Sequence, residues 1–512
     1  MLAAALLSKD LTMLDKVFEF GDVLINPSRA ALRDLAQPGE MTTRWGSPAY
    51  ISRVRSRSAA FTVTDIDDGF SPEDLDEVRA VREYLSDKEM LQVDRVMGMD
   101  AERSFRCRLY IRPSLARVAM MWQASLFAHN TGDARGPDFV TVYVPEWHRR
   151  RILVSLETGL TLVLGVDYYG ESKMSFLRQA MYAAKTRWGG IGLHAGSKLL
   201  TVRNAETNEL QERGAIFFGL SGTGKTSLTC HHHELEGEET VEILQDDIVF
   251  MDASGACYGT EEGFYIKTEG LDPKDQELLY DAAISENAIF ENTWVGPDRE
   301  VDFENGALTG NGRALVLRPE VKNTSERIDL KKSHLVFFIT RNQTIVPPVA
   351  RLNPAQAAAA FMLGESIKTS AADPTAKGEP VRCVGTNPFI VGSLSAEGNR
   401  FYDIIKRNAD DIECFLLNTG KIGGPQGEKI SLMASQAIIR ELARGTVQWK
   451  KDADWGYETP VSIPGLEVEQ FEPQRFYSDQ ELNELTSELK ADRQEWLSSF
   501  PGLDEEIVEV FQ

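Results

Sequence analysis

A glycine-rich run near the middle of the chain has the residues that a polyphosphate site needs. The apolar stretch 215–218 leads directly into Gly219-Leu-Ser-Gly-Thr-Gly-Lys-Thr226, and the residues that follow favour a helix. The three glycines would let backbone N–H groups turn toward phosphate oxygens, while Lys225 would neutralise the β- and γ-phosphates and Thr226 would place its hydroxyl on Mg²⁺. A glycine turn before a helix has a similar composition, but the preceding strand favours a phosphate loop. We therefore expect a nucleoside triphosphate to bind Gly219, Leu220, Ser221, Gly222, Thr223, Gly224, Lys225, Thr226 and Ser227.

A pair of acidic residues follows the next apolar stretch and could hold a metal ion. Residues 241–244 are typical of a strand, and Gln245-Asp-Asp247 comes directly after them. In phosphate-loop enzymes an aspartate at the end of such a strand reaches the Mg²⁺ beside the triphosphate, so Asp246 or Asp247 is a candidate metal ligand. The alternative is that the aspartate caps a helix.

Three adjacent histidines, His231 to His233, also suggest a metal site. Side chains at neighbouring positions diverge on a helix and on a strand, which disfavours a shared ion. We interpret the charged segment 230–240 as a solvated loop.

The elements that must position these residues alternate between strands and helices. Buried strands are expected at 152–155, 161–165, 215–218, 241–244 and 336–340, and helices at 71–87, 175–185, 353–360 and as a closing pair within the acidic tail 480–509. The stretch 368–380 is rich in small residues and predicts a mobile loop. This alternation predicts an α/β fold.

Length, charge and cysteine content limit the classes of function. A chain of 512 residues is too long for one ordinary core and predicts two or three packed lobes. The formal net charge of −23 argues against a general nucleic-acid or membrane-surface binder, so an anionic substrate must be met by local lysines and arginines. Five scattered cysteines lack the spacing of a zinc site or a disulfide framework and fit a reducing cytoplasm. The apolar residues 1–7 lack a basic lead-in and are interpreted as the start of a terminal helix.

Several segments in a consistent order make the chain similar to the ATP-dependent phosphoenolpyruvate carboxykinases. Beside the glycine-rich run, they are Asn26-Pro-Ser28, Met121-Trp-Gln-Ala-Ser125, Gly190-Ile-Gly-Leu-His194, Phe264-Tyr-Ile-Lys-Thr268, Phe290-Glu-Asn292, Val301-Asp-Phe-Glu-Asn-Gly306, Gly310-Asn-Gly-Arg313, Val346-Pro-Pro-Val349, Leu417-Asn-Thr-Gly420 and Lys429-Ile-Ser431. The resemblance spans roughly residues 20 to 480, is patchy over the first 150, and is far more specific than a phosphate loop alone.

The resemblance implies a reaction and two metal ions. The family decarboxylates oxaloacetate and transfers the γ-phosphoryl group of ATP to the resulting enolate, which gives phosphoenolpyruvate, ADP and CO₂ for gluconeogenesis. It implies Mg²⁺ on the nucleotide, held by Thr226, and Mn²⁺ between substrate and γ-phosphate, held by a lysine, His194 and Asp247. A neutral imidazole and a carboxylate are suitable ligands for such an ion.

The resemblance also assigns residues to the substrate and the nucleotide. Arg313 corresponds to an arginine against substrate and γ-phosphate, and Arg55 to the arginine that grips the substrate carboxylate, although Arg57 fits as well. With Tyr168, Lys173 and Lys225 they form the expected catalytic set. Lys267, Glu291, Lys429, Ile430 and Ser435 complete the expected nucleotide site.

The chain departs from the family on the substrate side. The family motif ends in two lysines, whereas here the run is Tyr168-Tyr-Gly-Glu-Ser-Lys-Met174, so the lysine expected on Mn²⁺ is replaced by Met174. A thioether is a poor ligand for a hard cation. Either Lys173 takes the role, the metal site is altered, or the acceptor is not oxaloacetate.

These observations predict a two-lobed α/β fold of the carboxykinase type. We expect a substrate-side lobe over 1–200 and a nucleotide lobe over 201–512 that carries a mobile lid near 368–380. The leading function is a cytoplasmic, ATP-dependent carboxykinase that acts on a dicarboxylate keto acid as a monomer or small homo-oligomer, without nucleic-acid or membrane partners. One alternative is a kinase of the same fold with another small-molecule or protein acceptor. The other is a protein that binds ATP without turning it over, which Lys225, Asp247 and Arg313 disfavour.

Overall fold

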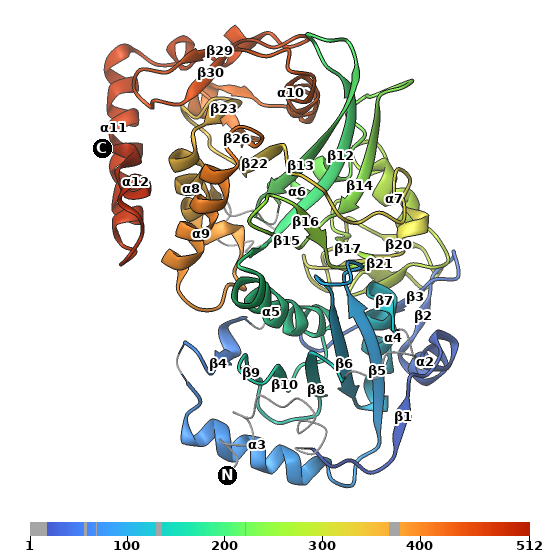
Figure 1. Ribbon diagram of the computed structural model, residues 1–512. Coiled ribbons are helices and arrows are strands. Elements are labelled where there is room, and N and C mark those ends of the chain that lie inside the picture. The colour runs from blue at the N-terminus through green and yellow to red at the C-terminus, as the bar shows by residue number, and fades with distance from the viewer. Residues whose placement is uncertain (1–17, 56–58, 68, 130–135, 221, 368–378) are drawn as a thin grey trace. The chain divides into compact units, whose positions relative to one another are not determined.

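The computed structural model describes residues 18–55, 59–67, 69–129, 136–220, 222–367 and 379–512. It has a mixed α/β architecture (Figure 1). The described residues form two compact units that alternate along the chain. The first contains the described parts of Met1–Arg187 with Thr260–Lys322 and Phe389–Gly392, and the second contains Trp188–Gly259, Asn323–Pro388 and Ser393–Gln512. A single boundary near residue 200 was predicted, whereas residues 260–322 pack with the first unit.

The first unit is built on two sheets. One has the order β1 (Val23–Ile25), β5 (Met90–Met97), β6 (Phe105–Ile111), β8 (Phe139–Val144), β10 (Leu160–Leu164), β9 (Arg151–Ser155) and β4 (Thr62–Thr64), with β7 (Phe127–Ala128) beside β5. The other has the order β17 (Phe264–Lys267), β21 (Arg313–Val316), β18 (Ile289–Glu291), β3 (Pro48–Tyr50) and β2 (Met41–Thr42), and β19 (Trp294–Val295) pairs with β20 (Val301–Asp302). The helices of this unit are α2 (Arg29–Ala36), α3 (Pro72–Leu85), α4 (Ala116–Ser125), α5 (Tyr169–Trp188) and α7 (Glu277–Ala283).

Strand β8 is buried throughout because helices cover both of its faces. Val140, Val142 and Val144 share one core cluster with Val81 and Leu85 of α3. The alternate residues point the other way, where Thr141 and Tyr143 form hydrogen bonds with Ser175 and with the carbonyl of Tyr168. Figure 1 shows α3 and α5 on opposite sides of these strands. Each fully buried aliphatic side chain of this core stabilises the fold by about 1.5–3 kcal/mol.

The second unit is built on a long sheet. Its order is β14 (Thr240–Gln245), β12 (Ala195–Arg203), β13 (Leu210–Phe218), β22 (Leu335–Thr340), β26 (Glu413–Asn418), β23 (Val349–Leu352), β30 (Glu458–Ser462) and β29 (Gln448–Lys451). Smaller pairings join β11 (Ile191–Leu193), β15 (Val249–Met251) and β16 (Cys257–Gly259), then β24 (Glu365–Ile367) with β25 (Pro380–Arg382), and β27 (Lys421–Ile422) with β28 (Glu428–Lys429). Its helices are α6 (Lys225–Thr229), α8 (Pro354–Leu363), α9 (Leu394–Arg407), α10 (Leu432–Arg444), α11 (Asp479–Ser498) and α12 (Glu505–Val508).

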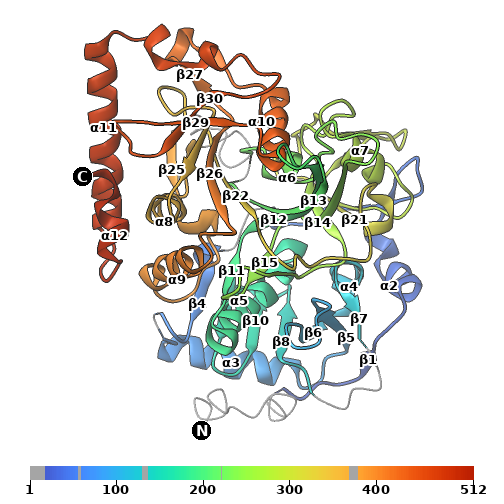
Figure 2. The same cartoon turned by 45° about the horizontal axis from the view of Figure 1, so that its top comes forward.

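Phenylalanines on neighbouring strands fix the register at the centre of this sheet. The rings of Phe217 and Phe337 stack at 4.9 Å, whereas Phe218 and Phe338 stack at 5.1 Å on the opposite face. Phe401 of α9 meets the edge of Phe218 at 5.9 Å, so α9 covers that second face. Figure 2 shows α8 and α9 side by side against it.

The expected strands at 152–155, 161–165, 215–218, 241–244 and 336–340 are present as β9, β10, β13, β14 and β22. The helices expected at 71–87, 353–360 and 480–509 are present as α3, α8 and the pair α11 and α12. The helix expected at 175–185 begins earlier, at Tyr169. The predicted terminal helix at 1–7 and most of the predicted mobile loop, 368–378, lie outside the described residues.

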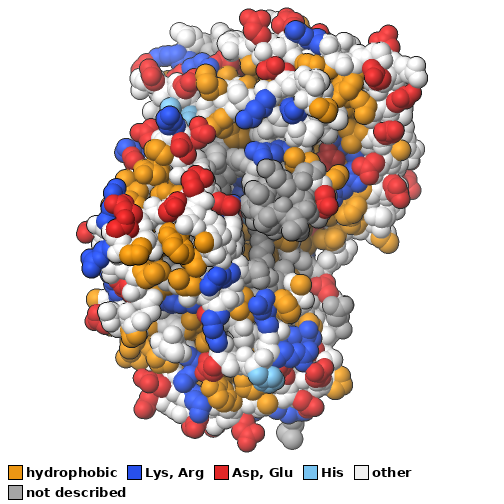
Figure 3. Space-filling model, turned by 180° about the vertical axis from the view of Figure 1, so that it is seen from behind, with side chains coloured by type: hydrophobic (Ala, Val, Ile, Leu, Met, Phe, Trp, Pro, Cys, Tyr) orange, Lys and Arg blue, Asp and Glu red, His pale blue; other side chains and the backbone are white. Residues whose placement is uncertain are grey.

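Acidic side chains outnumber basic ones in this chain, and the two kinds are mixed at the surface. On the face shown in Figure 3, Asp and Glu side chains are interspersed with Lys and Arg. None of the helices that the structure describes has the length and apolar content needed to span a bilayer.

Candidate active site

The glycine run connects the end of β13 to the start of α6, as the sequence predicts. Gly224 has a φ of 101°, a conformation that strains any side chain. Gly219 approaches the loop closely, since a Cβ there would lie 2.5 Å from Oγ1 of Thr223. That hydroxyl donates to the carbonyl of Leu220 at 2.7 Å, and Thr419 donates to the carbonyl of Thr223 at 2.8 Å. Thr419, which directly follows β26, therefore braces the loop. Ser221 lies outside the described residues.

Three predicted residues meet beside this loop. Lys225 opens α6, and its Nζ lies 3.1 Å from Oδ1 of Asp247. The same carboxylate oxygen lies 2.9 Å from Nε2 of His194. The three come from α6, the end of β14 and the turn between β11 and β12, so the fold assembles them from distant segments. Asp246, the other candidate aspartate, is buried at 5% exposure, whereas the Asp247 side chain is 24% exposed.

His194 is held in an orientation that suits a metal ligand. Its Nδ1 lies 2.6 Å from the carbonyl of Thr386, which can only accept, so Nδ1 carries a proton. Its Nε2 lies 2.9 Å from the Asp247 carboxylate, so it either donates a second proton there or, once that proton is lost, can ligate a cation. Burial lowers the pKa of His194, the nearby Lys225 lowers it further, and Asp247 opposes both. A neutral imidazole nitrogen and a carboxylate oxygen that face each other fit a divalent cation such as Mn²⁺. The described residues contain no cluster of three or more His, Cys, Asp or Glu side chains around it, so a third protein ligand would be of another type.

The histidine run is not the solvated loop that the sequence predicts. His233 has no exposed surface, and its ring contacts the buried Nζ of Lys198 on β12. Lys198 also donates to the carbonyl of Leu228, in the last turn of α6, and to that of His231 at 3.3 Å. The prediction was wrong because the partner of His233 lies 35 residues earlier in the chain. Lys198 thus satisfies carbonyls at the C-terminal end of α6, the helix that follows the glycine loop.

The residues expected around the adenosine lie at the start of α10. Ile430 belongs to a core cluster with Ile422, and its N–H donates to the carbonyl of Gly420 at 3.0 Å. Ser435 is buried, and its hydroxyl donates to Ser431 at 3.3 Å, whereas Lys429 is exposed. Gly420 directly follows Thr419, the residue that braces the glycine loop. The structure therefore brings this segment near the loop, while contact with a nucleotide stays a prediction.

The first unit aligns three other predicted residues across one sheet. Lys267 on β17, Arg313 on β21 and Glu291 on β18 are direct cross-strand partners, so their side chains share a face. Glu291 is fully buried and accepts from Arg117 at 2.9 Å and from the hydroxyl of Tyr265 at 2.9 Å. Burial raises the pKa of Glu291, and Arg117 opposes this shift. Lys267 forms an ion pair with Glu269.

Tyr265 lies at the centre of the predicted substrate residues. The guanidinium of Arg313 lies 5.7 Å from its ring centroid and Nζ of Lys173 lies 5.9 Å from it. Arg313 also donates to Asn311 at 2.8 Å, and Asn311 donates to the hydroxyl of Tyr168 at 3.2 Å. Tyr168, Lys173 and Arg313 are thus gathered in one unit, as expected for a common substrate.

The guanidinium of Arg55 is held by hydrogen bonds to backbone carbonyls. Its Nε donates to Ser52 and its Nη1 to Leu308, each at 3.0 Å. Neither bond involves another predicted site residue. Arg57, the equal fit, lies outside the described residues.

Four residues of these clusters escaped the sequence analysis. Tyr265 and Asn311 lie inside segments that carry the family resemblance, so the resemblance could have identified them. Arg117 and Glu261 lie in no such segment. Their roles depend on pairing with Glu291 and Lys173, which only the fold reveals.

Comparison with known proteins explains why these clusters occur together. A family model described as phosphoenolpyruvate carboxykinase matches residues 30–469. The phosphoenolpyruvate carboxykinase (ATP) of Aeropyrum pernix is 35% identical over 492 residues, which cover 95% of this chain and 96% of the relative. The chain belongs to the ATP-dependent phosphoenolpyruvate carboxykinase family. Other members are more distant. The enzyme of Thermus thermophilus is 27% identical over 81% of this chain and 80% of its own length, and that of a Geobacter species is 24% identical over 88% and 85%.

In this carboxykinase, Lys173 and Met174 lie in the first turns of α5. Nζ of Lys173 lies 2.8 Å from Oε2 of Glu261, and both side chains are at most 4% exposed. Met174 is also buried, at 8% exposure. Because successive helix positions differ by about 100°, the two side chains point in different directions. Lys173, the one lysine of the family motif that this chain keeps, is therefore paired with a carboxylate that the sequence did not reveal.

Proposed function

We infer that the protein converts oxaloacetate and ATP into phosphoenolpyruvate, ADP and CO₂. In this reaction the bond between C3 and C4 of oxaloacetate breaks, CO₂ leaves, and the enolate oxygen that results forms a bond to the γ-phosphorus as ADP departs. Family membership over residues 30–469 is the observation that carries this inference. The product is the phosphoenolpyruvate that gluconeogenesis uses.

The second unit supplies the nucleotide side of this chemistry. We propose that the glycine loop 219–224 is a phosphate loop and that Lys225 neutralises the charge of the β- and γ-phosphates. We propose that Thr226 and Asp247 hold the Mg²⁺ of ATP and that His194 and Asp247 hold Mn²⁺. When bound, these ions would supply Lewis-acid stabilisation to the enolate and to the transferring phosphoryl group.

The first unit supplies the substrate side. The guanidinium of Arg313 is planar and permanently charged, so it can donate hydrogen bonds to oxygens of the substrate and of the γ-phosphate. Arg55 is the proposed carboxylate-binding arginine, and Tyr168 and Lys173 complete the set. Proposed nucleotide roles for Lys267, Glu291, Lys429, Ile430 and Ser435 rest on the resemblance and on their placement.

The kinase alternative is favoured by Met174 alone. It is tested by measuring ADP formation with and without oxaloacetate, in the presence of Mg²⁺ and Mn²⁺. A carboxykinase forms ADP only when oxaloacetate is present. A kinase with another acceptor shows a rate that oxaloacetate leaves unchanged.

We further propose that the protein acts in the cytoplasm as a monomer or small homo-oligomer. Its scattered cysteines fit a reducing compartment. Light scattering of the purified protein would give the oligomeric state.

A further inference from the structure

Arg341 lies at the edge of the long sheet where the glycine loop begins. Strands β13, β22 and β26 are parallel to one another, so their carboxyl ends meet at the same edge. The glycine loop follows β13, Arg341 follows β22 and Thr419 follows β26. In α/β proteins ligands bind outside the carboxyl ends of the parallel strands. Arg341 therefore occupies the edge of the second unit at which a ligand is expected.

Hydrogen bonds hold the backbone around Arg341 against the segment that braces the glycine loop. The carbonyl of Thr340 accepts from the N–H of Thr419 at 2.9 Å, and the N–H of Asn342 donates to the last side chain of β26 at 3.0 Å. Thr419 in turn donates to the carbonyl of Thr223 in the glycine loop. A single residue thus connects the backbone beside Arg341 to the loop.

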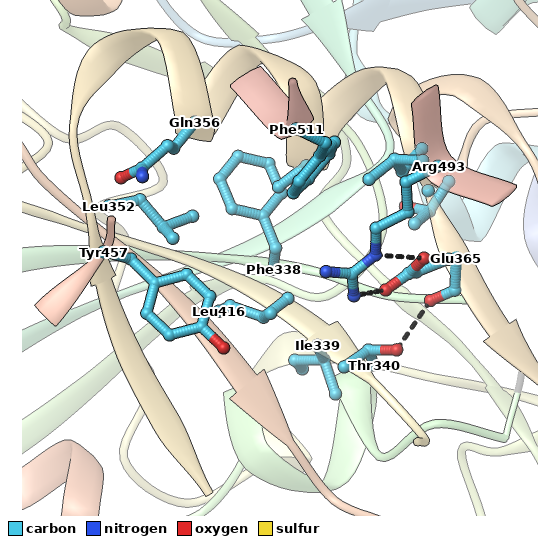
Figure 4. Close-up of a pocket in the computed structure, with 14 residues that line it drawn as sticks. Phe338, Ile339, Thr340, Leu352, Gln356, Glu365, Leu416, Tyr457, Arg493 and Phe511 are labelled. Atoms are coloured by element: carbon cyan, nitrogen blue, oxygen red, sulfur yellow. Dashed lines mark hydrogen bonds and ion pairs between the residues drawn. The ribbon is translucent and has the colours of Figure 1, made fainter. Parts of the chain in front are cut away.

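The alternation of β22 directs the Arg341 side chain toward the loop. Thr340 points the other way, where its hydroxyl donates to the carbonyl of Glu365 at 2.9 Å (Figure 4). Ile339 lies on the loop side, since a Cβ on Gly219 would be 3.4 Å from the Cβ of Ile339. Side chains two positions apart on a strand share a face, so the alternation, continued by one residue, places Arg341 on the side of Ile339.

Arg341 is partly buried, yet it has no partner of opposite charge among the residues that the structure describes. Its buried Nε has no hydrogen-bond partner there either. Burial lowers the pKa of Arg341, and no charged group of the described chain opposes this shift. Other partly buried arginines of the second unit form ion pairs with glutamates, among them Arg213, Arg351 and Arg444.

The lack of a carboxylate at Arg341 is informative because the chain is acidic. It has 78 Asp and Glu residues against 55 Lys and Arg residues, so a carboxylate partner is not scarce. A partly buried cation without a counter-charge is unfavourable, and a bound anion would supply that charge. Phosphate suits a guanidinium, whose planar group can donate two parallel hydrogen bonds to it.

We propose that Arg341 donates hydrogen bonds to the polyphosphate of ATP, as a second cation in addition to Lys225. This inference rests on the proposed phosphate loop. It assigns to the nucleotide a residue that lies outside the glycine run and outside the start of α10.

Isothermal titration calorimetry of the full-length protein with ATP and Mg²⁺, without oxaloacetate, tests the proposal. We expect Arg341→Met to bind ATP about tenfold more weakly or worse, since a charge-assisted hydrogen bond is lost. Adenosine, which has no phosphate, should bind the wild type and the variant equally in ligand-observed NMR. Arg407→Met removes the same charge from an exposed position of α9 and should bind ATP as the wild type does.

Thermal unfolding without nucleotide separates binding from folding. Arg341→Met breaks no ion pair of the described chain, so its melting temperature should equal or exceed that of the wild type. Arg341→Gln takes its place if Arg341→Met does not fold. Unchanged affinity for ATP in the variant, or an equal loss of affinity for adenosine, overturns the proposal.

Lys225→Ala distinguishes a failure of this proposal from a failure of the phosphate loop. If Lys225→Ala loses affinity for ATP while Arg341→Met keeps it, only the role of Arg341 is overturned. If both variants bind ATP as the wild type does, the glycine loop is not the nucleotide site, and the role of Arg341 is overturned with it.

Discussion

Lys173 is the residue on which the substrate assignment depends most. It is paired with Glu261 in a buried setting, so Lys173→Met alone leaves an isolated carboxylate and should cost about 3–5 kcal/mol of stability. The double variant Lys173→Met, Glu261→Gln removes both charges and should recover much of the melting temperature. If Lys173 serves the reaction, both variants lose phosphoenolpyruvate formation. A stable double variant that keeps wild-type activity would show that Lys173 is only the partner of Glu261.

Lys225 tests the nucleotide side. Its ammonium is 3.1 Å from Asp247 and is placed to offset phosphate charge, so Lys225→Ala should lower turnover by about 10²- to 10³-fold while the protein remains folded. Lys322→Ala, which removes an exposed lysine paired with Asp281, is the matched control and should be silent. Steady-state rates and thermal unfolding of both variants provide the check. Undiminished activity in a folded Lys225→Ala protein would remove the loop from the mechanism.

His194 tests the substrate-side metal. His194→Gln keeps a polar side chain but replaces the imidazole nitrogen that faces Asp247, so we expect the Mn²⁺ concentration for half-maximal activity to rise about tenfold or more. The affinity for ATP should change far less. His148→Gln, on an exposed histidine of the first unit, is the control. If Mn²⁺ activation and ATP affinity moved together, the assignment of His194 to this ion would be withdrawn.

Among the elements, α6 depends on a contact that lies far away in sequence. Lys198 donates to carbonyls of Leu228 and His231 and contacts His233, and Lys198→Met would leave these acceptors buried without a donor. We expect a stability loss of about 1–3 kcal/mol and a higher KM for ATP than for the wild type, with the KM for oxaloacetate little changed. Lys451→Met, on an exposed strand position, controls for the substitution. An unchanged KM for ATP would mean that Lys198 supports the fold without positioning the glycine loop.

Elements whose residues carry their own signal were predicted well. β13 and β22 are continuous apolar runs, and α8 has the capping residue Asn353 before it and Gly364 in a left-handed conformation after it. The start of α5 was missed because the residues from Tyr169 to Met174 include a glycine and polar positions that lack clear helical spacing. They are helical because the fold buries them. His233 was misjudged for a similar reason, since its burial depends on Lys198.

At the scale of the whole molecule, pairing between distant strands determines which unit a segment joins. Local sequence patterns do not show this pairing. Residues 260–322 follow the nucleotide motifs in sequence, so a boundary near 200 looked natural. Instead β18 pairs in parallel with β3 and in antiparallel with β21, which places Glu291 and Arg313 in the unit that begins the chain. The family resemblance suggested the residues of the site clusters, but only the topology shows which of them share a unit.

We expect this chain to be a working carboxykinase despite Met174. The most direct measurement is the amount of phosphoenolpyruvate and ADP formed by the purified protein from oxaloacetate and ATP with Mg²⁺ and Mn²⁺. We predict one phosphoenolpyruvate for each ADP, with activity lost in Lys225→Ala. ADP formation without phosphoenolpyruvate, or no ADP at all with oxaloacetate present, would show that the protein does not catalyse this reaction.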